Sequence, residues 1–196
     1  MVMVTSAGLL LPFQTIYQGK TNRSCPEPTS PNYGDAIAAG FRFEFSGTAT
    51  YWSNQRTMQD FVDKMLAPYF DCTKVKLGLP LQQKSLWQID VWAVHRSNEF
   101  LDWMRENHPT ILVDFVPGGC TGIAQPCDVG IQRLFKHVTN HAFLEDVVSS
   151  TLAQIDQQNE KIVFDDHLPV LRNASVRWLW LAYQALNKVE IVQKVS

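Results

Sequence analysis

The first 45 residues contain three short strand-like runs of hydrophobic positions, separated by turn and loop residues. Residues 1–5 and 9–18 flank Ser6-Ala7-Gly8, which predicts a β-hairpin, and Pro12 places its second strand near a sheet edge or a bulge. Residues 19–35 hold three prolines and two glycines, so we expect a loop or an insertion there. Residues 41–45 alternate aromatic with charged side chains and predict another strand.

The middle of the chain alternates helical and strand patterns. Apolar residues recur at three- and four-residue spacing over 56–66, where Asn54 precedes the run as an N-cap, and Ser97 similarly precedes a helix over 98–107. The apolar runs 85–92 and 110–115 predict strands. Because strands and helices follow one another, the pattern predicts an α/β domain with a mixed sheet.

Two further helices are expected near the C-terminus. From Asp128 onward an apolar face recurs with helical period, comprising Ile131, Leu134, Phe135, Val138 and Ala142. Residues 173–187 form a helix that is apolar nearly all round, and such a helix is normally buried. Since this helix lies close to the C-terminus, the sequence leaves open what covers it.

Composition narrows the class of protein. The 196 residues are 45% hydrophobic, which is ample for a packed core and excludes a disordered chain. The net charge of −2 excludes a strongly basic protein that coats nucleic acid, although not a local basic groove. No run of about 20 apolar residues occurs and no basic segment precedes the N-terminal apolar residues, so we expect an intracellular chain with reduced thiols and no membrane partner.

Acidic residues concentrate in the middle of the chain. Residues 85–128 contain six acidic and two basic side chains, which gives a local charge of −4. Carboxylates brought together could hold a divalent metal ion. For Glu99, Asp102 and Glu106 we favour the simpler interpretation, the hydrated face of a helix, because helical spacing explains them.

Two acids stand apart from this face. Asp90 lies in a strongly apolar strand pattern, where an ionised carboxylate is costly unless it is paired, hydrogen-bonded or bound to metal. Asp128 lies at the expected start of a helix, where it could equally be a helix cap. An acid on a strand combined with an acid at a helix start is the arrangement used by two-metal phosphoryl-transfer sites.

Other candidate chemistries fit poorly. Cys120, Cys127, His137 and His141 superficially resemble a zinc finger, but the gaps of six residues between the cysteines and nine before the first histidine are wrong for one. Nothing in the sequence specifies a base for a cysteine nucleophile. The glycines of residues 118–122 lack the lysine and the strand-to-helix context of a phosphate-binding loop.

Longer segments resemble a known family. LLLPFQTIYQGKT (residues 9–21), WQIDVWAVHRSNEF (87–100) and FVPGGCTGIAQPCDVGIQRLFKH (115–137) resemble the DDE superfamily endonucleases. More narrowly, they resemble the catalytic domain of pogo-type transposases, the group with centromere-protein-B-like and jerky-like relatives. LPVLRNASVRWLWLAYQALNK (168–188) is similar to the helical tail that follows this domain in fungal members.

The resemblance implies a fold and a reaction. The fold would be ribonuclease-H-like, a mixed five-stranded sheet flanked by helices, with residues 1–145 as the endonuclease core and 146–196 as a helical C-terminal extension. The reaction would be Mg²⁺- or Mn²⁺-dependent hydrolysis of a DNA phosphodiester, followed by attack of the freed 3′-hydroxyl on target DNA. Asp90 and Asp128 would be the second and third catalytic, metal-binding carboxylates. His95 would either support Asp90 or be purely structural, and Asp114 is not assigned to the metal.

The sequence also departs from the family pattern. In the family the first catalytic Asp lies on a strand upstream of the hairpin, whereas this chain starts at the equivalent of the second strand; Asp35 and Asp60 are not credible substitutes. We therefore expect an incomplete core that lacks the first strand and is catalytically defective on its own. DNA is the expected partner and the nucleus the expected location.

Non-catalytic alternatives remain open at this point. The chain could be a domesticated remnant that only binds nucleic acid, with Arg96, Arg133 and Lys136 either forming a basic groove or simply lying on the hydrated surface. It could also be a protein-interaction fragment, forming a homo-oligomer or binding a protein partner through the apolar C-terminal helix.

Overall fold

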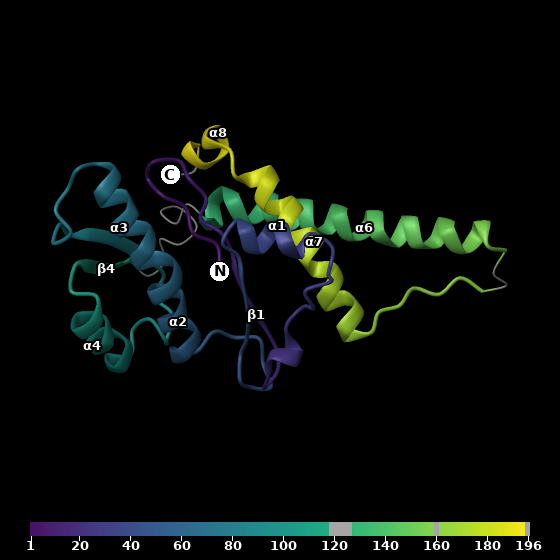
Figure 1. Cartoon of the computed structure of the whole chain (residues 1–196), viewed down its shortest axis with the longest axis horizontal. Helices are drawn as coiled ribbons and strands as arrows, with labels where there is room; N and C mark the ends of the chain where they lie inside the picture. Colours follow the sequence, from purple (N-terminus) through teal and green to yellow (C-terminus); the bar gives the residue numbers. More distant parts are fainter. Residues whose placement is uncertain (118–126, 159–160, 195–196) are drawn as a thin grey trace.

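The computed structural model describes residues 1–117, 127–158 and 161–194, which form an α/β protein with two parallel strand pairs (Figure 1). β1 (Gln14–Tyr17) pairs with β2 (Arg42–Phe45), and β3 (Ser85–Ile89) pairs with β4 (Ile111–Phe115). The helical segments are η1 (Asn22–Ser24), α1 (Tyr33–Ala38), α2 (Gln55–Phe61), η2 (Val62–Leu66), α3 (Ala67–Lys76), α4 (Asn98–Asn107), η3 (Cys127–Ile131), α6 (Gln132–Asp156), α7 (Leu168–Leu186) and α8 (Val189–Gln193). The α/β class is confirmed, while the single ribonuclease-H-like mixed sheet stays a prediction.

The N-terminal hairpin forms around one isolated antiparallel bridge, between Val4 and Leu10, and not as two full strands. The Thr5 amide donates to the Leu9 carbonyl and the Leu11 amide to the Met3 carbonyl, each at 2.9 Å. Gly8 closes the turn at φ +81°, in the left-handed region that favours glycine. The hairpin therefore delivers the chain directly into β1.

Two hydrophobic cores lie on either side of residues 1–4. The first is built mainly from α2, η2, β3 and α4, and the second from the segment before β1 and from α1, η3, α7 and α8. Met1 and Met3 pack against the first core, whereas Val2 and Val4 pack against the second. Because successive side chains of an extended segment point to opposite faces, this short stretch joins both halves of the protein.

The helix expected over 56–66 starts at its predicted cap but runs further. The Asn54 side chain accepts from the Thr57 amide, and the Thr57 side chain accepts from the Asn54 amide, which forms a capping box. Beyond α2 the chain continues through the π-helical segment η2 into α3, which ends at Lys76. The sequence pattern missed α3, whose first turn contains Pro68, because proline is also typical of a helix break.

Most other local expectations hold. The strands over 41–45, 85–92 and 110–115 and the helix over 98–107, capped by the Ser97 side chain, are confirmed with small shifts of their ends. The prediction of a loop over 19–35 is wrong at its end, because α1 begins at Tyr33. Asn32, at φ +60°, turns the chain into this helix.

The apolar C-terminal helix is covered within this chain. α7 starts at Leu168, five residues before the predicted start, and packs along α6 and against α1. Val176, Ala182 and Leu186 are buried, and the Tyr183 ring meets Phe41 edge-on with centroids 5.1 Å apart. Among the described residues, no helix combines the length and hydropathy needed to cross a lipid bilayer.

Candidate active site

Asp90 lies at the carboxyl edge of the β3–β4 pair. β3 ends at Ile89, whose carbonyl accepts a hydrogen bond of 2.9 Å from the Val116 amide just beyond β4. The two strands are parallel, so Asp90 and Val116, which follow β3 and β4, lie at the same edge of the pair. Crevices at this edge are the usual ligand sites of α/β proteins.

The expectation that Asp90 is buried is wrong. Its side chain is 49% exposed, because β3 ends one residue earlier and Asp90 begins the following turn. One carboxylate oxygen lies 3.0 Å from Nδ1 of His95. The acid is therefore accessible to a ligand and is also held in place.

His95 supports Asp90 from the protein interior. The ring is buried, and its Nδ1 lies 3.2 Å from the Asp90 carbonyl as well as close to the carboxylate. Trp92 packs edge-on against the ring at 5.4 Å, and Trp87 and Phe100 surround it. A ring fixed by aromatic contacts restricts the rotamers of the acid that it contacts.

Asp128 lies in η3, at the entrance to α6. The Gln132 side-chain amide donates to its carboxylate. Cys127, the preceding residue, donates from Sγ to the Val2 carbonyl at 3.7 Å. Asp128 is therefore adjacent to a residue that contacts the N-terminal segment.

The same N-terminal segment borders Asp90. Met1 and Val2 line a cavity of about 510 Å³ together with Asp90 and His95. Asp90 and Asp128 have 37 residues between them, and the N-terminal segment meets Asp90 at this cavity and Cys127, the neighbour of Asp128, through Val2. Within the described parts of the chain the two acids have different partners, His95 and Gln132.

The ionisable groups around residues 1–2 do not neutralise the negative charge of Asp90 and Asp128. Burial raises the pKa of the Cys127 thiol to about 11, and the negative charge of Asp128 adds to this effect. Burial lowers the pKa of the Met1 α-amino group to about 6. The α-amino group is therefore mainly neutral at pH 7 and supplies little positive charge, and the thiol stays protonated and neutral.

The donor chemistry at the two acids suits a hard divalent cation. Mg²⁺ is commonly held by one or two carboxylates, with water and substrate phosphate completing its shell. Across residues 1–117, 127–158 and 161–194, no group of three or more His, Cys, Asp or Glu side chains is placed to hold a metal ion. Asp90 and Asp128 each offer carboxylate oxygens of the kind that Mg²⁺ prefers.

The other residues considered as metal ligands or nucleophiles either lie on the exposed surface or fall outside the described residues. His137 and His141 are exposed on α6, where His141 lies 3.3 Å from Glu145, as expected for a hydrated helical pair. The cysteine and glycine patterns within residues 118–126 lie outside the described residues. The acids of α4 (Glu99, Asp102 and Glu106) are exposed, which confirms the hydrated helix face.

Sequence reasoning missed the aromatic wall of the cavity. Trp52 and Trp92 line it together with Gln14 and Phe135, although they come from four separate segments. The one local signal was the adjacent pair Tyr51-Trp52 in an otherwise polar stretch just before the Asn54 cap. The site is thus an accessible acid at a strand end beside an aromatic cavity.

An acid at the carboxyl end of a parallel strand, opening onto a cavity, defines a candidate enzyme site of an α/β protein. The family model of the DDE superfamily endonuclease matches residues 2–194, and the chain belongs to this family. Comparisons with curated proteins and with solved structures gave no match. The resemblance of the sequence segments is confirmed at the level of the family.

Proposed function

We propose that this chain is a transposase-derived DDE endonuclease domain of the pogo type that acts on DNA, with Asp90 and Asp128 as its second and third metal-binding carboxylates. The observation that carries the proposal is the position of Asp90, half-exposed at the carboxyl edge of β3–β4 and lining a cavity with Val2, whose carbonyl accepts from Cys127, the residue before Asp128. Family membership supports DNA as the substrate class.

The residues of the chain have separable roles in this proposal. Asp90 and Asp128 supply oxygen ligands, His95 orients Asp90, and Gln132 orients Asp128. A bound Mg²⁺ or Mn²⁺ would neutralise charge on a phosphodiester and lower the pKa of a bound water. The half-exposed carboxylate of Asp90 leaves room for a phosphate to approach the site.

We further propose that the polypeptide alone is catalytically defective and binds DNA without cutting it. The support is that the described residues contain no group of three or more His, Cys, Asp or Glu side chains placed to hold a metal ion. Arg96, Arg133 and Lys136 are exposed and available for phosphate contacts. In this proposal residues 1–145 form the endonuclease core and 146–196 the extension, and the protein acts in the nucleus.

A manganese titration tests the site assignment. Mn²⁺ binding to the purified chain is followed by the electron paramagnetic resonance signal of free Mn²⁺, for wild type, Asp90→Asn and Asp128→Asn. The matched control is Asp114→Asn, an exposed acid on β4 that accepts from Gln88 at 3.2 Å. We expect weak binding that is lost in the first two variants and kept in the control; binding unchanged in all variants overturns the assignment.

A nicking assay tests the catalytic state. Supercoiled plasmid is incubated with each protein and Mn²⁺, and DNA binding is measured in parallel with EDTA present. We expect nicking by the wild type to equal that of Asp90→Asn, together with DNA binding that weakens with salt and persists in EDTA. Mn²⁺-stimulated nicking that disappears in Asp90→Asn would show an active nuclease and refute the proposed defect.

One observation favours protein interaction as a second function. Leu144, Val148, Leu152 and Ile155 follow one another at intervals of four, four and three residues along α6, and each is 51–57% exposed. Figure 1 shows this C-terminal half of α6 projecting past α7. A stripe of this spacing is typical of a helix that pairs with another helix, so a second copy of this chain is the proposed partner. Light scattering should show a dimer that Leu152→Glu converts to monomer; a wild-type monomer contradicts the idea.

A further inference from the structure

The cavity beside Asp90 has walls unlike those of a metal site. Its lining is dominated by aromatic and aliphatic side chains, among them Phe13, Trp52, Trp92 and Phe135. No lysine or arginine occurs among the described residues that line it, and Asp90 contributes negative charge. A phosphate would be repelled from this interior, whereas a flat, neutral ring would be accommodated.

Three aromatic rings form a platform at this cavity. Tyr51 and Trp52 are 63% and 59% exposed and stack with centroids 5.3 Å apart and an interplanar angle of 28°. Trp92, from the turn after Asp90, lies 6.3 Å from Trp52 at 38°. Large aromatic side chains are costly to leave in water, and a contiguous exposed set marks a binding surface.

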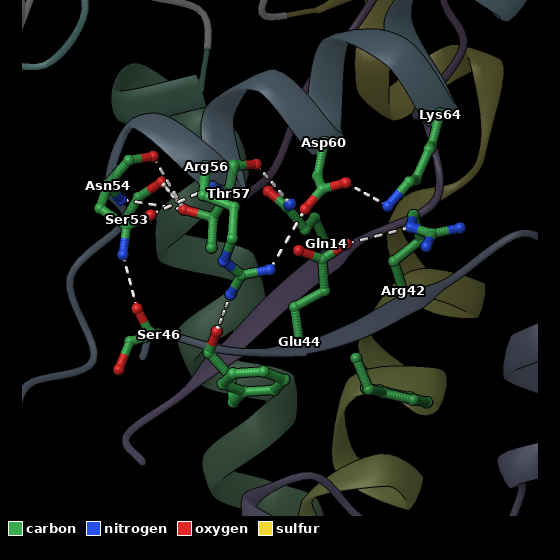
Figure 2. Close-up of polar contacts among 12 residues, drawn as sticks. Gln14, Arg42, Glu44, Ser46, Ser53, Asn54, Arg56, Thr57, Asp60 and Lys64 are labelled. Carbon is green, nitrogen blue, oxygen red and sulfur yellow. Dashed lines mark hydrogen bonds and ion pairs between the residues drawn. The ribbon is translucent and has the colours of Figure 1, made fainter. Parts of the chain in front are cut away.

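The platform is held rigidly by the start of α2. Figure 2 shows the Asn54 side chain reaching the Ser46 carbonyl while its other atoms complete the capping box with Thr57. Ser53 and Thr57 share a hydroxyl hydrogen bond of 2.8 Å, and Gln14 donates to the Thr57 carbonyl at 2.8 Å. Trp52 is therefore anchored through its neighbours, and a ligand would need little reorganisation to stack on it.

Polar atoms at the cavity lack partners. Gln14 Oε1 and His95 Nε2 belong to buried side chains that line the cavity, and neither atom has a hydrogen-bond partner among the described residues. A buried polar atom without a partner is destabilising. A ligand that carries hydrogen-bond donors and acceptors on the rim of a flat ring could satisfy such atoms after a small side-chain adjustment.

We propose that this cavity binds one unpaired nucleobase of a DNA strand, stacked on Trp52 and Trp92, with the adjoining phosphates outside the cavity. The proposal rests on the proposed DNA substrate and deepens it, since it assigns single-stranded or locally unpaired DNA as the preferred form. Stacking tolerates any base, so the site selects for unpairing and not for sequence.

Fluorescence anisotropy with three labelled DNA probes tests this site, with EDTA present throughout. The first probe is a duplex with a short single-stranded extension, the second replaces the extension with abasic nucleotides, and the third is the blunt duplex. The abasic probe keeps the phosphates and removes the bases. We expect the wild type to bind the first probe about tenfold more tightly than the second, as stacking of one base predicts.

Variants separate stacking from general DNA affinity. Trp52→Ala and Trp92→Leu should abolish the preference for the first probe and leave blunt-duplex affinity unchanged, while Trp52→Phe keeps part of it. Trp103→Leu, at a tryptophan on α4 outside the cavity, is the matched control and should retain the preference. Circular dichroism confirms that each variant is folded.

The outcomes distinguish this proposal from the one on which it rests. Equal affinity for the first and second probes, with duplex binding intact, overturns the nucleobase site and leaves DNA binding standing. An equal loss for all three probes in Trp52→Ala also overturns it, because Trp52 would then be a general contact. Absence of binding to every probe overturns the proposed DNA function itself.

Discussion

Asp146 joins α6 to α7, and its removal should weaken the protein measurably. Its carboxylate accepts from Arg177 Nη1 at 2.8 Å and from Trp178 Nε1 at 2.6 Å. The Trp178 ring also meets Phe143 edge-on at 5.3 Å. Asp146→Ala removes both hydrogen bonds and leaves this ring contact in place, so the perturbation isolates the polar part of the α6–α7 junction.

The expected magnitude follows from exposure. Hydrogen bonds to charged groups contribute about 1.5–3 kcal/mol each. The side chains of Arg177 and Asp146 are 30% and 32% exposed, so solvent screening reduces each bond to about 1 kcal/mol. We therefore expect Asp146→Ala to lower the free energy of unfolding by about 2 kcal/mol. For a chain of this length that corresponds to a drop in Tm of about 4–8 °C.

Urea denaturation followed by far-ultraviolet circular dichroism measures this change, with Glu145→Ala as the matched control. Glu145 contacts the same Arg177 through Nη2 at 3.0 Å, but its side chain is 47% exposed and does not reach Trp178. The control should lose less than about 0.5 kcal/mol, as exposed ion pairs do. Equal losses for the two variants, or no loss for Asp146→Ala, would refute the assignment of this junction to Asp146.

Three further predictions concern the hairpin, alkaline stability and thiol reactivity. Gly8→Ala should lower Tm more than Gly47→Ala: both glycines have positive φ, but a Cβ at Gly8 would lie 2.8 Å from a side-chain carbon of α8, whereas Gly47 faces open space. Burial raises the pKa of Tyr17 to about 12 from its ordinary 10, so the folded state keeps a proton that the unfolded state loses. The free energy of unfolding should therefore fall as pH rises from about 10 towards 12, and urea titrations should show a smaller fall in Tyr17→Phe. At pH 8, iodoacetamide followed by peptide mass mapping should label the exposed Cys72 before Cys127, whose thiol is held protonated by burial; equal rates would contradict that burial.

The candidate site was only partly predictable from the sequence. Asp90 and Asp128 stood out because an acid within an apolar strand pattern and an acid at a helix start are unusual together. The partners that hold them, His95 and Gln132, are near in sequence, yet their roles depend on where β3 ends and how η3 enters α6. Asp90 is half-exposed because β3 ends at Ile89, three residues earlier than its apolar pattern indicates.

Local structure depends on residues that are close together in the sequence, so it could be predicted from the sequence alone. The Asn54 and Ser97 caps, the hairpin turn at Gly8 and the helical period of α4 all arise from residues within a few positions of one another. Such features are set by backbone geometry and short-range hydrogen bonds, and the structure confirms them. The α/β class followed from the same local patterns.

Only the tertiary structure decided how distant segments meet. It placed residues 1–4 between the two cores, covered α7 with α6 and α1, and assembled Gln14, Trp52 and Trp92 around one cavity. Each of these contacts joins residues far apart in the chain, and the hydrophobic effect that drives them is non-directional. An apolar period shows that a face must be buried, whereas the packing of the whole chain selects the partner that buries it.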